Sequence, residues 1–125
     1  MGTLREVVID CRHAPSLARF WAAALDDYDV LPYDDAEIAR LAGLGLTPET
    51  DPTVAVGGPM PTLFFQQVPE GKIAKNRLHL DIEAPDRSAE VERLVALGAT
   101  IEVIREGWTS LLDPEGNEFC VADPD

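Results

Sequence analysis

Val7-Val8-Ile9-Asp10 and Leu78-His79-Leu80-Asp81 begin two parts of this chain in the same way, and together they decide the fold. In each stretch a strand-like apolar pattern ends on an aspartate, and an amphipathic helical pattern follows within a few residues. The two aspartates are 71 positions apart, and this offset aligns helix residues of the first part with those of the second: Phe20, Ala23 and Ala24 with Val91, Leu94 and Val95. Such internal similarity predicts one supersecondary unit used twice.

The apolar periodicity, with proline, glycine and aspartate as punctuation, extends this repeat along the chain. The first copy is expected to contain strands at 4–11, 28–33, 53–56 and 62–68, a helix at 15–25 and an additional helix at 34–46. The second is expected to contain strands at 77–83, 100–105, 108–112 and 118–122 and a helix at 85–97. We therefore predict a single α+β domain over residues 1–125. Its two βαβββ modules, at about 4–68 and 76–123, would form a curved mixed sheet around a cavity, with the helices outside.

Composition narrows the classes of partner. The 125 residues include 23 acidic and 10 basic side chains, a formal net charge of −13, which argues against nucleic acid as a partner. The acidity favours solubility, or the attraction of a cationic small molecule. No apolar run is long enough for a membrane span, and the N-terminus has no signal-peptide pattern, so we expect a cytoplasmic protein.

Strand alternation predicts which side chains face the cavity. If the apolar residues of each strand lie under the helices, one polar group from each of four strands points to the other face. These four groups are Glu6, Gln66, His79 and Cys120. The two cysteines, Cys11 and Cys120, form no CxxC pair, which argues against a zinc knuckle.

Several motifs carry a family resemblance. They are the segment from Arg77 to Ile82, the helix end Leu97-Gly98-Ala99, the turn and strand from Asp113 to Phe119, and Val8-Ile9-Asp10-Cys11 leading to Phe20-Trp21. In order and spacing they resemble the vicinal oxygen chelate superfamily, within its glyoxalase-like and bleomycin-resistance-like branch. The resemblance implies paired βαβββ modules around a cavity, usually in a homodimer, and in the enzymes a divalent metal bound by one residue from each of four strands.

Carried over to this sequence, the metal positions of the superfamily fall on Glu6, Gln66, His79 and Cys120. Members usually have histidine or glutamate there. His79 matches fully, and Glu6 is an acceptable oxygen ligand at a position that the alignment fixes only to within one residue. Gln66 is a neutral ligand, and Cys120 stands where a carboxylate is usual. Such a set does not suit Mg²⁺ or Mn²⁺, whereas zinc accepts carboxylate, imidazole and thiolate. We expect an incomplete metal site, and no cofactor is assigned beyond a possible divalent ion, zinc or another.

Each of these side chains also has a structural interpretation. His79 is either an acid/base group or a histidine hydrogen-bonded by Asp81 or Gln66. Cys120 is expected to be an inert, core-like thiol, because the acidic chain offers little positive charge to lower its pKa. Arg77 either clamps an anionic group or forms a surface ion pair. Trp108 either lines the bottom of the pocket or packs in the core.

Three functions remain open. The first is a glyoxalase-like protein that binds a small organic molecule in the groove between the modules, with His79 as the catalytic candidate and Phe64, Gln66, Arg77 and Trp108 as ligand contacts. The second is a metal-dependent lyase, isomerase or dioxygenase, in which an ion polarises substrate oxygens. The third is a resistance protein that sequesters a cationic drug. Whether the chain is an enzyme stays open at this point.

Overall fold

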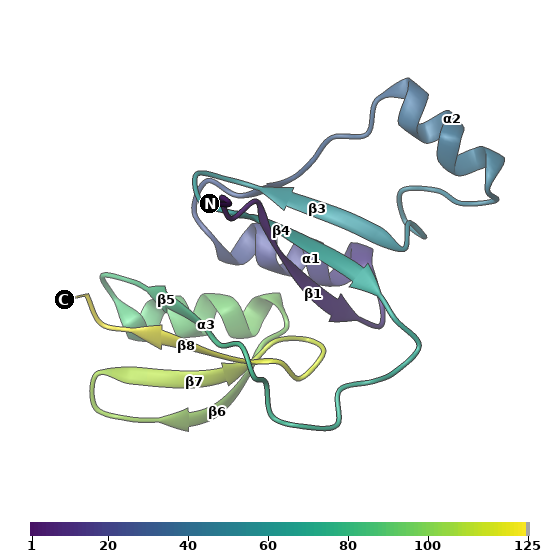
Figure 1. The fold of residues 1–125 in the computed structure, drawn as a ribbon. Coiled ribbons are helices and arrows are strands. Elements are labelled where there is room, and N and C mark those ends of the chain that lie inside the picture. Colours follow the sequence, from purple (N-terminus) through teal and green to yellow (C-terminus); the bar gives the residue numbers. More distant parts are fainter. Residues whose placement is uncertain (125) are drawn as a thin grey trace. The chain divides into compact units, whose positions relative to one another are not determined.

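The computed structural model describes residues 1–124, and the chain divides into two compact units, Met1–Gly71 and Lys72–Asp125. Each unit contains one four-stranded mixed sheet with helix packed on it (Figure 1). The α+β class and the two βαβββ modules predicted from the sequence are confirmed. Among the described residues, no helix is long and apolar enough to span a bilayer.

The first unit runs through β1 (Glu6–Cys11), α1 (Ala14–Ala24), β2 (Asp29–Val30), α2 (Asp35–Gly43), β3 (Thr53–Gly57) and β4 (Thr62–Gln67). Its strand order is β1-β4-β3-β2. The edge strand β1 pairs with β4 in parallel, and the other neighbouring strands are antiparallel. A parallel pair needs a crossover connection, and α1 supplies part of it while covering β3 and β4.

The apolar stripe of α1 forms the core of the first unit. Leu17 and Trp21 are buried, and the rings of Phe20 and Trp21 meet edge to face at 5.3 Å. The helix begins after His13, whose side chain accepts a hydrogen bond from the backbone N–H of Ser16. A side-chain acceptor at this position satisfies a backbone donor that the helix itself leaves unpaired. His13 is therefore explained by capping.

The additional helix α2 has no counterpart among the described residues of the second unit. Asp34 caps it by accepting a hydrogen bond of 2.8 Å from the backbone N–H of Glu37. Leu41 is its buried residue. The segment that returns from α2 is held by the buried carboxylate of Asp51, which accepts a 2.9 Å hydrogen bond from the Tyr33 hydroxyl. Burial and this bond raise the pKa of Tyr33.

The second unit runs through β5 (Leu80–Glu83), α3 (Arg87–Leu97), β6 (Thr100–Ile104), β7 (Trp108–Leu112) and β8 (Glu118–Ala122). Its strand order, β5-β8-β7-β6, repeats that of the first unit. The edge strand β5 again pairs in parallel with its neighbour, β8. Asp86 caps α3, and Gly98 ends it with a φ of 121°, a left-handed conformation that favours glycine. Phe119 and Leu94 are fully buried between sheet and helix.

The start of β5 differs from the prediction. The sequence predicts a strand from residue 77, with Leu78 beneath the helix, but the ladder begins at Leu80 and Leu78 is 60% exposed. Leu80 pairs with Phe119, so Leu78 would need Asn117 as its neighbour. Asn117 is engaged elsewhere, because its backbone and side-chain N–H groups donate to the carboxylate of Asp113 within the turn before β8. His79 therefore lies just outside the ladder.

Candidate functional site

The second unit brings three of its polar side chains together. Asp81 of β5 and Cys120 of β8 are register partners, so their side chains share one face of the sheet. His79 precedes β5 and lies between them: its Nδ1 is 3.1 Å from Oδ1 of Asp81, and its Nε2 is 3.7 Å from Sγ of Cys120. These three residues each offer a nitrogen, oxygen or sulfur atom within 4.8 Å of the others.

The same face continues the polar row across the other two strands. Ser110 of β7 is the register partner of Cys120 and is almost fully buried. Its hydroxyl donates a 2.9 Å hydrogen bond to the carboxylate of Glu102 in β6. Glu102 reaches this position at a register shift between Ile101 and Val103, where the chain bulges. The row therefore links all four strands of the sheet.

Cys120 is a reduced thiol at the centre of this row. Burial raises its pKa, and the nearby negative charge of Asp81 raises the pKa further, whereas a hydrogen bond with Ser110 acts in the opposite direction. The neutral thiol is therefore the resting form of Cys120 at neutral pH.

A hollow of about 470 Å³ opens above this cluster. Trp108, 40% exposed, contributes its indole ring to the lining and so lies at the surface of the hollow instead of in the core. The lining is completed by His79, Asp81, Gly107, Cys120, Ala122 and Asp123. An apolar ring beside a few convergent polar groups is typical of a small-molecule site.

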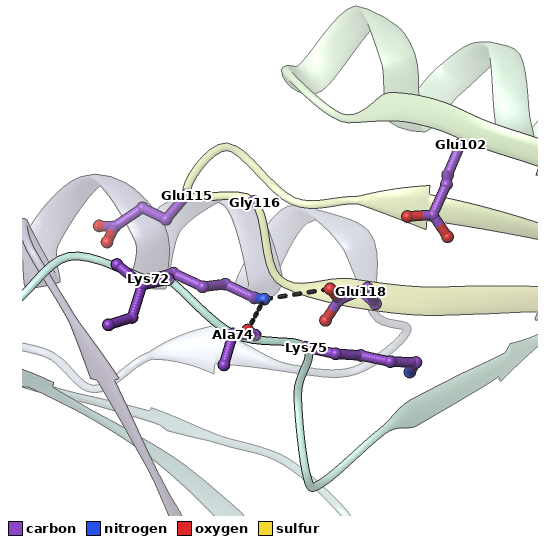
Figure 2. A pocket seen from close by; sticks show the side chains of 8 residues that line it. Lys72, Ala74, Lys75, Glu102, Glu115, Gly116 and Glu118 are labelled. Atoms are coloured by element: carbon purple, nitrogen blue, oxygen red, sulfur yellow. Dashed lines mark hydrogen bonds and ion pairs between the residues drawn. The ribbon is translucent and has the colours of Figure 1, made fainter.

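A second hollow, of about 410 Å³, lies beside the segment that leads to His79 (Figure 2). There Glu118 binds the incoming chain: it accepts hydrogen bonds of 3.0 Å from Lys72 Nζ and 2.9 Å from the backbone N–H of Asn76. Lys72 Nζ also donates to the carbonyl oxygen of Ala74. Burial alone would raise the pKa of Glu118, but the hydrogen bonds that it accepts from Asn76 and Lys72 lower its pKa to about 2.

The contacts of Glu118 with Lys72 and Asn76, which form a clamp on the incoming chain, were not predicted. The sequence places Glu118 on the cavity face by alternation, but Lys72 and Asn76 belong to a polar loop with no periodic pattern. Their contacts with Glu118 cross 46 and 42 positions of sequence, a separation at which local patterns carry no information. The only signal is the position of Glu118 on the same face as Cys120, two residues away.

The other predicted contacts are distributed over both units. Arg77 is exposed before β5 and is not among the residues that line the hollow at His79. In the first unit, Phe64 of β4 pairs with Val8 in register and is half-buried, and Gln66 is exposed beside Asp10.

Glu6 and Gln66 do not meet within their sheet. Glu6 is the register partner of Thr62, four residues before Gln66, and it forms an ion pair with Arg5 at 3.0 Å. At about 3.3 Å per residue the two positions are roughly 13 Å apart along the parallel strands, which is more than two side chains on one ion can span. The neighbour that the register gives to Gln66 is Asp10.

The cluster of His79, Asp81 and Cys120 offers nitrogen and sulfur donors, the atom types that a soft metal ion prefers. Two tetrahedral zinc ligands, one nitrogen and one sulfur, are separated by about 3.6 Å, close to the 3.7 Å between His79 Nε2 and Cys120 Sγ. Asp81 would then orient the ring through Nδ1, as carboxylates do behind metal-bound histidines. This unit therefore supplies two inner donors, fewer than the three or four protein ligands usual for zinc.

Comparison with known families identifies this architecture. The sequence pattern of the glyoxalase-like domain matches residues 6–122, nearly the whole chain. The chain belongs to the glyoxalase-like domain family. The motifs around Asp113 and His79 thus carry a true family relationship, as the sequence resemblance implied. Among proteins of curated function, no sequence matches this glyoxalase-like chain significantly.

Solved structures confirm the fold of this glyoxalase-like chain at low sequence identity. A glyoxalase/bleomycin resistance protein/dioxygenase family enzyme from Burkholderia phytofirmans PsJN is 14% identical, with a TM-score of 0.68 and 98% of each chain covered. The oxidase ChaP-H2 is 13% identical, with a TM-score of 0.64 over 100% of this chain and 95% of its own.

A third similar structure is a mutant fosfomycin resistance protein, FosX, from Listeria monocytogenes, complexed with Mn(II) and 1S,2S-dihydroxypropylphosphonic acid. It is 8% identical, with a TM-score of 0.65 over 98% of this chain and 90% of its own. At such identities the three structures share a fold with this chain, and a fold hosts many chemistries.

Proposed function

We propose that this glyoxalase-like protein binds a small organic molecule in the hollow formed by His79, Trp108 and Cys120. The observation that carries the proposal is the arrangement of these side chains: an accessible indole and an imidazole border one hollow of about 470 Å³. Indole supplies apolar contact area, and imidazole supplies a directed hydrogen bond, which together favour a ligand with one polar group on a flat apolar body. The FosX complex, in which a fold of this type holds a small organic acid, supports the proposal.

In this site His79 contacts the ligand as a hydrogen-bonding and acid/base group. The carboxylate of Asp81 lies next to Nδ1, so Nε2 is the ring nitrogen that faces Cys120 and the hollow. The negative charge of Asp81 disfavours anionic ligands, and uncharged or cationic compounds are expected to bind best.

A binding screen tests this function. Ligand-observed NMR with small aromatic and heterocyclic compounds identifies ligands of the wild type, and their affinities are then measured for Trp108→Ala and His79→Ala. We expect each substitution to weaken binding by about 10-fold or more, since each removes a direct contact. Val95→Ala, at an exposed position of α3, serves as the control. Unchanged affinities in both hollow variants, with unchanged circular dichroism, would refute the assignment.

A metal-dependent activity is the second candidate, and the 3.7 Å between His79 Nε2 and Cys120 Sγ, close to the spacing of two zinc ligands, favours it. His79 Nε2 and Cys120 Sγ would hold a soft ion such as zinc, which when bound supplies Lewis-acid polarisation of a substrate oxygen. Elemental analysis of the purified protein tests this candidate, together with zinc titration of the wild type and Cys120→Ser. Zinc affinity that is the same in the two proteins would exclude Cys120 as a ligand.

We also propose that the chain forms a homodimer, the assembly that its superfamily resemblance implies. Light scattering coupled to size-exclusion chromatography gives the mass directly. A mass of 13.6 kDa at all concentrations would exclude the dimer.

A further inference from the structure

We propose that Cys120 is a nucleophilic thiol, activated by His79 and Asp81, that adds to an uncharged α,β-unsaturated carbonyl compound held against Trp108. This inference rests on the proposed function and specifies the chemical class of the ligand. It replaces the expectation of an inert thiol, which considered only whether positive charge near Cys120 could hold a resting thiolate.

The first step of the argument is geometric. An activated nucleophile needs a base within hydrogen-bond reach, and that base needs a third group to orient it. Sγ of Cys120 lies 3.7 Å from Nε2 of His79, within hydrogen-bond distance for sulfur. Nδ1 of the same ring lies 3.1 Å from Asp81. The three residues thus stand in the order nucleophile, base and orienting carboxylate.

The second step concerns the proton. A neutral ring that carries its proton on Nδ1, the nitrogen 3.1 Å from the Asp81 carboxylate, keeps its lone pair on Nε2, the atom that faces the thiol. Because the attacking form of a cysteine is the thiolate, the proton of the Cys120 thiol has to pass to a base as the new bond forms. His79 is the base in this position, so the reactivity of Cys120 should depend on His79 more strongly than that of an exposed cysteine would.

The third step is access. Cys120 is partly buried but lines the open hollow, where Trp108 offers a flat apolar surface and Gly107 leaves space beside it. The acidic side chains of this lining are Asp81 and Asp123, and Asp123 is paired with Arg87 at 2.9 Å. An uncharged, planar electrophile fits this combination better than an anion does.

The reaction is an addition and needs no oxidant or reductant. His79 Nε2 takes the thiol proton as Sγ forms a bond to the β-carbon, and the π electrons of the C=C bond move toward the carbonyl to give an enolate. The imidazolium then returns the proton to the α-carbon. The product is a thioether that contains all atoms of the thiol and the electrophile, and the neutral ring is restored.

Intact-mass kinetics test the inference in the full chain. The chain has two cysteines, so Cys11→Ala leaves Cys120 as the single thiol. This protein is incubated at pH 7, with a chelator, in acrylamide or in propionamide, its saturated analogue. We expect one acrylamide adduct per chain and none with propionamide. We also expect adduct formation to be faster in the folded than in the urea-unfolded protein.

Variants in the Cys11→Ala background separate activation from simple exposure. His79→Gln should slow adduct formation by about 10²-fold, the range of one lost general base, and Asp81→Asn by about 10-fold. His13→Gln, which changes the other histidine of the chain, is the matched control and should react at the parent rate. Equal rates in the parent and His79→Gln, with both proteins folded by circular dichroism, would overturn the inference.

Failure of the inference can be distinguished from failure of the proposed function. The ligands from the binding screen are measured again with Cys120→Ser, which forms no thioether. If these ligands still depend on Trp108 while Cys120 shows no dependence on His79, the nucleophile is wrong and the binding site stands. If the ligands do not depend on Trp108 either, the site itself is wrong.

Discussion

The carboxylate of Asp81 lies 3.1 Å from Nδ1 of His79, on the side of the ring away from Cys120. His79 is outside the β5 ladder, and its ring has Nδ1 toward Asp81 and Nε2 toward the thiol. The two side chains are only two residues apart along the chain.

The tautomer of His79 tests this relationship directly. In alkaline buffer the neutral ring should carry its proton on Nδ1 in the wild type, because the negative carboxylate of Asp81 lies 3.1 Å from that nitrogen. Asp81→Ala should shift the proton toward Nε2. Long-range ¹H–¹⁵N correlation spectra report the tautomer, and the ring of His13 provides an internal reference. The same tautomer in both proteins would show that Asp81 does not orient the ring.

Glu118 should make the free energy of unfolding depend on pH in the acidic range. Its pKa is about 2 in the folded protein, below the ordinary value of 4.5, so its ionised form stabilises the fold above pH 4.5. This contribution should disappear as the pH falls from 4.5 toward 2. Urea unfolding of Glu118→Gln at pH 7 should show a loss of about 2 kcal/mol and a weaker pH dependence below 4.5. Glu92→Gln, at an exposed position of α3, should resemble the wild type.

The repeat predicts matched effects of core substitutions. Phe65 of β4 and Phe119 of β8 are both fully buried, and each lies in an inner strand that pairs in parallel with the edge strand β1 or β5 of its own sheet. Phe65→Leu and Phe119→Leu should each cost about 1–2 kcal/mol, less than the roughly 3–5 kcal/mol of an alanine. Hydrogen exchange should report the loss mainly in the unit that carries the change. Equal loss of protection in both units would show that they unfold together.

Removal of the α2 cap should act locally. Asp34→Ala leaves the backbone N–H of Glu37 without its acceptor, at a cost of about 1 kcal/mol. Because Leu41 is the buried residue of α2, this helix has little tertiary packing to compensate. We expect faster hydrogen exchange over 35–43 with an almost unchanged melting temperature. A large fall in melting temperature would instead place α2 in the cooperative core.

Electrostatic attraction separates the drug-sequestering alternative from the other two functions. With a net charge of −13, the chain should bind a cationic glycopeptide more weakly as salt is added, because the screening length falls from about 30 Å at 0.01 M to about 10 Å at 0.1 M. Isothermal titration at these two salt concentrations measures the effect. Absence of binding at low salt would remove this alternative.

The sequence predicts the helices and the repeat because these rest on local patterns. The periodic stripe of α1 and the helix end at Gly98 are read directly from neighbouring residues, and the structure confirms them. The start of β5 could not be read in this way. The apolar alternation continues through Leu78, but Asn117, the neighbour that it would need, is held in a turn.

In the candidate site, too, some features follow from local sequence patterns and others do not. Alternation correctly places Asp81 and Cys120 on one face, and their pairing in register confirms it. The contact of Glu102 with Ser110 depends on a shift of register within β6, which leaves no trace in the sequence pattern. Interactions that depend on a bulge or on a long-range clamp are thus the ones that need coordinates.

The irregularity in β6 also bears on the solubility of the protein. β6 is an edge strand of its sheet, and Ile101 and Ile104 are exposed on it. A regular β6 would therefore present an apolar edge with unpaired backbone groups, to which a strand of a second molecule could add. The displaced register at Glu102 interrupts that template and places a carboxylate beside it. A deletion of Glu102 that restores an even pleat should therefore promote fibrous aggregation, even though it shortens the chain by a single residue.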